Sequence, residues 1–240
     1  ISQHGGSFPP LFVTFQHEED ISNKYITWFK PYHKKHVQLS PNKIQFFKKR
    51  NFLKNNCSII GFECPRYSYR VTAGAISHQA IKFFDQTSLF CEKLNNKIKT
   101  NLNIRPYPNL GWYTKERYID KFGESVIDNS RSYKSFIHKS KLIVCTYPQT
   151  TFSEAMATGI PTILLFDPIY NELIPECHSL LEILMDSKIV FTDSTLAAEH
   201  INNVWDNILE WWNSKEVINA RNVFFNTALP IKSDWKNEWV

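Results

Sequence analysis

Glycine is scarce in this chain: only seven of its 240 residues are glycine. The glycine-rich loops that cradle phosphates in many nucleotide-binding proteins therefore have little material here. The five cysteines form no Cys-x-x-Cys pair and no regular spacing, which indicates reduced thiols rather than a disulfide framework. No signal peptide is recognisable, and no apolar run approaches the ~20 residues of a membrane span. We therefore expect a cytoplasmic protein.

The composition supports a packed core. Hydrophobic residues make up 42% of the chain and aromatic residues 15%, so disorder is excluded. The net charge of +5 suits an anionic ligand or an anionic membrane surface, such as the inner face of the cytoplasmic membrane, but is too small to indicate nucleic acid. The densest basic run, Lys48–Arg50, is either a solvated face or a contact with ligand or membrane.

The chain opens on Ile1 and runs at once into a polar loop that contains glycine. We interpret it as the later part of a longer protein whose N-terminal domain is missing from this sequence. We expect residues 1–35 to be a segment leading from that domain, and residues 36–240 to form one ligand-binding domain.

Short apolar runs alternate with helical patterns from about Val37 onward, which is typical of β–α units around a parallel sheet. Several runs are almost continuously apolar, as are strands buried on both faces. The expected strands are 24–29, 58–62, 101–107, 141–146, 161–166 and 188–191, and the helical patterns cover 83–98, 132–138, 150–159 and 197–211. We therefore predict an α/β fold with an open, doubly wound parallel sheet.

The most informative segment is Lys141–Phe166, which has the pattern strand, loop, helix, glycine, strand. In open α/β sheets, ligands bind beyond the carboxyl ends of the strands. A helix N-terminus at that edge carries free N–H groups and a positive dipole end, both suited to phosphate. The polar groups of the loop come from Thr146, Gln149, Thr150 and Thr151.

Glu154 has two interpretations. It sits three or four residues after Thr150 and Thr151, so it fits a capping box in which one threonine caps the helix. Alternatively, its carboxylate accepts hydrogen bonds from both hydroxyls of a ribose. Gly159 is expected to end the helix in the left-handed conformation, and Pro161 to prevent its continuation.

This segment resembles the donor-binding segment of GT-B glycosyltransferases, with its pattern T-x-x-E-A-x-x-x-G-x-P. The wider sequence is similar to the transferases of surface-carbohydrate (O-antigen) biosynthesis. It departs from that family at Phe29, where a glycine is expected after the tryptophan. The similar pieces, in the expected order, are Gln3–Gly6, His17–Phe29, Arg105–Trp112, Thr146–Thr162 and Trp211–Trp212.

The resemblance implies a Rossmann-like C-terminal domain of a GT-B fold, with Glu154 on the ribose and the preceding loop and helix N-terminus on the phosphates. It implies a bacterial enzyme that takes a nucleotide-sugar donor and a glycan or lipid-linked acceptor. No further cofactor is implied. Because such an active site needs both domains, we expect these 240 residues alone to be inactive.

Three further groups are candidates at the site. His4, followed by Gly5 and Gly6, can transfer protons near neutral pH while the glycines let the backbone approach a ligand. Glu18 and Asp20 lie in the run His17–Asp20, which is either an exposed helix end or a source of a general base. No Asp-x-Asp motif occurs in the chain, so we expect no bound metal.

Arg105 ends an apolar strand, and its planar guanidinium suits two oxygens of a phosphate or carboxylate. A surface ion pair is the alternative. For the whole chain, the alternatives to glycosyl transfer are a GT-B-fold glycerophosphotransferase, a sugar-nucleotide epimerase, and a non-catalytic nucleotide- or glycan-binding module. Fold analogy alone does not choose among them.

Overall fold

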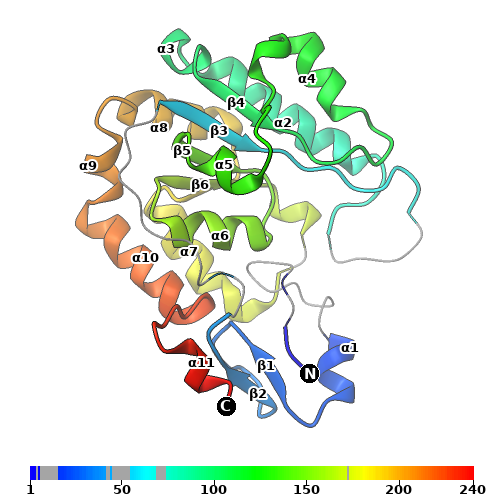
Figure 1. The fold of residues 1–240 in the computed structure, drawn as a ribbon, viewed down its shortest axis with the longest axis vertical. Helices are drawn as coiled ribbons and strands as arrows, with labels where there is room; N and C mark the ends of the chain where they lie inside the picture. The colour runs from blue at the N-terminus through cyan, green and yellow to red at the C-terminus, as the bar shows by residue number, and fades with distance from the viewer. Residues whose placement is uncertain (4, 6–15, 42–43, 45–54, 69–73, 172) are drawn as a thin grey trace.

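The computed structural model describes residues 1–3, 5, 16–41, 44, 55–68, 74–171 and 173–240. The basic run Lys48–Arg50 lies outside these residues, and so do His4 and Gly6. The described part contains a five-stranded and a two-stranded sheet, both parallel, with helices around the larger one (Figure 1). The predicted α/β class is therefore confirmed.

The larger sheet has the strand order β4-β3-β5-β6-β7. From β3 the chain first adds β4 on one side and then crosses back to add β5 on the other side. Such a reversal is a topological switch point, the position at which open α/β sheets bind ligands. All five strands fall within predicted segments or next to them: β3 (Asn56–Ile60), β4 (Leu102–Arg105), β5 (Ser140–Cys145), β6 (Thr162–Leu165) and β7 (Val190–Phe191).

Helices cover both faces of this sheet, as the doubly wound prediction requires (Figure 1). Successive strand residues point to opposite faces, so Val144 belongs to one buried cluster and Cys145 to the other. The first cluster is completed by residues of α2 (Gln79–Lys93), α3 (Asn96–Lys99), α4 (Thr114–Phe122) and α8 (Ser194–Val204). The second is completed by residues of α5 (Tyr133–Ile137), α6 (Thr150–Thr158), α7 (His178–Asp186) and α10 (Lys215–Ala228).

Two of the predicted helical patterns are each divided into two helices. The pattern over 83–98 breaks at Asn95, whose side chain accepts a hydrogen bond from the Ile98 amide at 3.0 Å and so caps α3. The pattern over 197–211 is split into α8 and α9 (Ile208–Trp212). Three short 3-10 turns complete the larger part: Glu124–Val126, Pro168–Tyr170 and Pro175–Cys177.

The two-stranded sheet lies beside the end of α10 (Figure 1). It pairs β1 (Tyr25–Thr27) with β2 (His36–Gln38), and Ser2 joins it through a bridge to Ile26. The sheet therefore includes residues on both sides of position 35, the expected boundary. Helix α1 (Gln16–Ile21) precedes β1 in the chain.

The end of the chain holds this small sheet to the larger part. The Gln38 side-chain amide donates to the carbonyl of Thr227 at 3.3 Å, at the end of α10. Beyond β2, the Ser40 amide donates to the Glu238 carboxylate at 3.0 Å, in α11 (Trp235–Glu238). Together with the Ser40 amide, the Lys232 ammonium lowers the pKa of Glu238 to about 2.

All five cysteines are buried free thiols, in agreement with the reading of the sequence. Burial raises their pKa values, so the thiolate forms are disfavoured. Among the helices of the described ranges, none is long and apolar enough to cross a bilayer.

His200 makes the fold sensitive to acid. Its ring lies between the rings of Phe191 and Trp211, at centroid distances of 5.5 and 4.9 Å. Burial, and secondarily the charge of Lys188, lowers the pKa of His200 to about 4 from its ordinary value near 6.5. Between these two values the unfolded chain binds a proton that the folded chain rejects, so stability falls as the pH drops from about 6.5 to 4.

We predict that His200→Leu lessens this acid destabilisation. Urea unfolding at pH 7.5 and pH 4.5 measures the effect, and the wild type should lose more unfolding free energy than the variant. Parallel losses in the two proteins would assign the acid sensitivity to other groups.

Candidate functional site

The carboxyl ends of three neighbouring strands lie flush with one another. In the strand register, Arg105 of β4 pairs with Ile60 of β3, and Ile60 pairs with Cys145 of β5. Neighbouring strands are about 4.8 Å apart, so the loops that follow β4 and β5 begin only ~10 Å from each other. We call this region, on the switch point between β3 and β5, the carboxyl-edge site.

Helix α6 begins at this edge, directly after the loop that follows β5. The predicted capping box is wrong: the residue before the helix is Gln149, and its side chain caps nothing. Thr150 and Thr151 instead form the first turn, because the chain turns into the helix one residue earlier than a threonine cap requires. The predicted helix end is confirmed, with Gly159 in the left-handed conformation at φ 74°. The N-terminus of α6 therefore lies at the carboxyl edge, and the positive end of a helix dipole favours anions.

Gly5 brings the start of the chain onto the start of α6. A Cβ atom placed on Gly5 would lie 3.2 Å from the Thr150 hydroxyl oxygen, and its φ of +116° is one that other residues rarely adopt. The preceding Gln3 is fixed on β1, since its side-chain oxygen accepts from the Trp28 amide at 2.9 Å and from the Thr27 hydroxyl at 3.1 Å. Gln3 is therefore anchored on the small sheet, and Gly5 lies beside the first turn of α6.

Tyr133 feels the charges of both Glu154 and Arg105. The Tyr133 hydroxyl donates to the backbone carbonyl of Thr151 at 3.2 Å, in the first turn of α6. Burial raises the pKa of Tyr133, the charge of Glu154 adds to this rise, and the charge of Arg105 opposes it. Two residues predicted to bind the donor, Arg105 and Glu154, thus both influence this one phenol.

Arg105 is held by a buried acid that the sequence analysis missed. Its Nη1 atom lies 2.6 Å from Oδ2 of Asp128, whose side chain is only 1% exposed, while the Arg105 side chain remains 31% exposed. Asp128 is itself fixed, since its other oxygen accepts from the Ser130 amide at 2.9 Å. The guanidinium also lies over the Phe136 ring at 5.8 Å. One nitrogen of the Arg105 guanidinium is thus anchored by Asp128, and part of the Arg105 side chain is accessible to solvent.

Thr146 serves the framework. Its buried hydroxyl donates to the backbone carbonyl of Ile60 at 2.8 Å and so ties the end of β5 to the end of β3. The bond gives the Ile60 carbonyl a partner at the point where the backbone hydrogen bonds between β3 and β5 end. The hydroxyl of Thr146 thus has a partner inside the protein, unlike the role expected for it in phosphate binding.

Glu63, just after β3, is a second acid that sequence reasoning missed. Its carboxylate is buried, with the residue 2% exposed, and accepts from the backbone amides of Leu110 at 3.0 Å and Trp112 at 2.8 Å. It therefore fixes the loop that follows Arg105. The sequence did contain a signal for Glu63: it is an acid that follows an apolar strand in the chain, and residues at that position lie at the ligand-binding edge of the sheet.

Aromatic rings lie beneath the loops of the site. Phe62 packs against Tyr147 and Tyr107, with ring centroids 5.1 and 6.2 Å apart. Tyr147 is buried, whereas Phe62 and Tyr107 are half-buried and keep part of their surface accessible. This arrangement gives the site an apolar floor next to its charged groups.

The run His17–Asp20 is engaged within the small sheet. The Tyr25 hydroxyl donates to the Glu18 carboxylate at 3.3 Å, and the Tyr32 hydroxyl to the Glu19 carboxylate at 3.2 Å. Burial, together with these carboxylates, raises the pKa of both tyrosines. Asp20 is exposed. Within the described ranges, no three His, Cys, Asp or Glu side chains gather as a metal-binding group.

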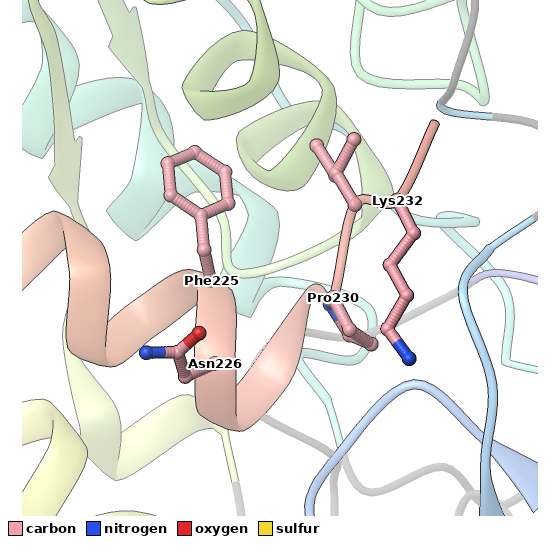
Figure 2. A pocket seen from close by; sticks show the side chains of 5 residues that line it. Phe225, Asn226, Pro230 and Lys232 are labelled. Carbon is pink, nitrogen blue, oxygen red and sulfur yellow. The ribbon is translucent and has the colours of Figure 1, made fainter. Parts of the chain in front are cut away.

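A hollow of about 330 Å³ lies at the end of α10, and none of its lining residues is one predicted for the donor site (Figure 2). Phe225 and Asn226 project from different sides of the helix there. Its only lining cation, Lys232, is paired with Glu238. The lining residues are Phe225, Asn226, Pro230, Ile231 and Lys232.

The five-stranded parallel sheet, its two helical layers and the site at its switch point define a Rossmann-like α/β protein. Compared with known protein families, the chain matches the LIC12162 family transferase over residues 1–240, and it belongs to that family. It is therefore a transferase. No curated protein matches the sequence.

We predict that Glu63→Gln destabilises the protein by about 1–3 kcal/mol, because one buried amide loses its acceptor and faces a second donor. Urea unfolding measures the change. The matched control is Glu92→Gln, which alters a half-exposed ion pair with Lys121 and should cost below ~1 kcal/mol. Equal losses in the two variants would mean that Glu63 does not hold the loop.

Proposed function

We propose that this transferase moves a sugar from a nucleotide-activated donor to a surface-polysaccharide or lipid-linked glycan acceptor. The observation that carries the proposal is the carboxyl-edge site itself. Arg105 ends β4 at the same edge of the sheet at which α6 begins, and the charges of Arg105 and of Glu154, which lies in α6, both act on the phenol of Tyr133. A nucleoside diphosphate needs these three groups: amides and a cation for phosphate, and an acceptor for ribose hydroxyls.

The proposed role of each group follows from its chemistry. The α6 amides and Arg105 stabilise the negative charge that develops on the departing phosphate. Glu154 accepts hydrogen bonds from the ribose. The accessible surface of Phe62 and Tyr107 suits the flat face of a nucleobase. Gly5 allows the start of the chain to close on the Thr150 side without a side chain in the way.

His4 is the proposed general base that activates the acceptor hydroxyl. Its neighbours Gln3 and Gly5 are placed by β1 and α6. Glu18, an alternative base, already accepts a hydrogen bond from the Tyr25 hydroxyl. Asp20 is the remaining alternative. Comparing the rates of His4→Ala, Glu18→Gln and Asp20→Asn assigns the role.

We predict that Glu154→Ala weakens donor binding about ten- to a hundredfold, the equivalent of ~1.5–3 kcal/mol for a hydrogen bond to a charged group. Thermal-shift screening against UDP-, GDP-, CMP- and dTDP-sugars first identifies the donor, because bound ligand raises the melting temperature. Titration calorimetry then compares the variants. The control Glu199→Ala removes an exposed acid from α8, on the other face of the sheet. Unchanged affinity in Glu154→Ala would contradict the ribose role.

We predict that Arg105→Lys impairs donor binding nearly as much as Arg105→Gln does. A lysine keeps the charge but cannot bind Asp128 and a phosphate through one planar fork. Affinity for the identified sugar nucleotide is the measurement, with the melting temperature as a check on folding. If lysine restored wild-type affinity, Arg105 would act only as a point charge.

Acceptor-dependent release of the nucleotide tests the reaction class. Release that requires a glycan or lipid-linked acceptor supports sugar transfer. Isomerisation of the sugar nucleotide without an acceptor would indicate an epimerase instead, and binding without turnover would indicate a binding module.

A further inference from the structure

Two loops at the carboxyl edge carry unusually exposed aromatic side chains. The first follows β3 and contains Tyr67, which is 80% exposed; the second follows β4 and contains Tyr113, which is 58% exposed. Exposed apolar side chains that cluster into one patch mark interaction sites, whereas single exposed apolar side chains do not. We call this surface the aromatic rim, and it consists of Arg66, Tyr67, Leu110, Trp112 and Tyr113.

The rim is rigidly built. The Arg66 guanidinium lies over the Tyr67 ring at 5.9 Å and over the Trp112 ring at 5.5 Å, so it links the two loops. The Arg66 amide donates to the Leu110 carbonyl at 3.1 Å. The buried Glu63 carboxylate holds the second loop from beneath, through the amides of Leu110 and Trp112. Rings fixed in this way lose little entropy when a ligand binds.

Tyr113 occupies a conformation that costs energy. Its φ of 55° and ψ of 42° are left-handed, which is rare and strained for a bulky residue. The side chain is more than half exposed, so burial of the ring offsets only part of this strain. The Asn109 side chain stabilises the turn by accepting from the amides of Gly111 at 2.8 Å and Tyr113 at 3.2 Å. The loop therefore holds the Tyr113 ring at the surface although the backbone conformation at Tyr113 lowers the stability of the fold.

The rim also carries exposed cations. Arg66, Lys115 and Arg117 are exposed, and in the part of the chain that the structure describes none of them forms an ion pair with a carboxylate. The Arg117 Nε atom donates to the Trp112 carbonyl at 2.9 Å, which places its charge beside the rim. Glu116 lies between Lys115 and Arg117 in the chain, and the buried Glu63 carboxylate lies beneath the second loop. The exposed guanidinium groups of Arg66 and Arg117 beside the rings favour an anionic ligand.

We propose that the aromatic rim binds an acidic oligosaccharide. Tyrosine ring faces suit the C–H faces of sugar rings, and guanidinium groups suit sugar carboxylates. If the proposed sugar transfer is correct, this oligosaccharide is the acceptor, because the rim loops leave β3 and β4 at the same edge as the donor site. Its binding by the rim does not itself depend on that reaction.

The test is titration calorimetry with an oligomer of galacturonic acid and with its methyl ester, which has the same sugar rings without the charge. We expect the acid form to bind more tightly than the ester. Tyr67→Ala combined with Tyr113→Ala should weaken binding at least tenfold. Arg66→Gln should remove most of the preference for the acid and lower the salt dependence.

The control is Leu196→Ala, which removes an equally exposed apolar side chain from α8. It should leave binding unchanged, and melting temperatures check that every variant folds. The proposal is overturned if neither oligomer binds, or if the rim variants bind as the wild type does. Binding to vesicles of phosphatidylglycerol is measured for the same variants. If the rim variants lose binding to these vesicles but not to the oligomer, the rim contacts a membrane and the proposal is overturned.

Failure of the rim and failure of the proposed function give different results. If sugar nucleotides bind with Glu154-dependent affinity but no galacturonic acid oligomer binds, only the rim proposal fails. If the oligomer binds through the rim while no sugar nucleotide binds, the rim stands as a glycan site and the sugar transfer fails.

Discussion

The pairing of β3 with β5 is the contact on which the candidate site depends. It joins segments that are far apart in the chain, and the hydroxyl of Thr146 closes it with a bond to the Ile60 carbonyl, 86 residues away in sequence. Because β4 lies on the other side of β3, the pairing also creates the switch point. The loops after all three strands then begin at one edge, the position at which open α/β sheets generally bind ligands.

Arg105 and Glu63, two charged groups at this edge, are held by partners that fix their positions. Asp128 anchors Arg105, and backbone amides anchor Glu63. A buried carboxylate without such partners would be strongly destabilising. The partners therefore do two things at once: they make the buried acids tolerable, and they hold the loops in one geometry before any ligand arrives. Preorganisation of this kind is what electrostatic stabilisation of a departing phosphate requires.

The strands were predictable because burial on both faces leaves continuous apolar runs, such as Leu142–Cys145. Gly159 marked a helix end for a local reason, since only glycine adopts that conformation easily. The break at Asn95 was missed because a side-chain cap competes with helix continuation only by a small free energy. Strand β2 was missed because its three residues carry too little pattern.

By itself, the sequence determined the alternation of strands and helices, the doubly wound class, and the candidate segment that starts α6. These follow from local patterns of burial and turn chemistry. Only the tertiary structure decided that Glu63 holds the Leu110–Trp112 loop, that Asp128 anchors Arg105, and that Gly5 lies against Thr150. Each of these contacts joins residues distant in the chain. No local pattern encodes such a contact, because it depends on which strands become neighbours.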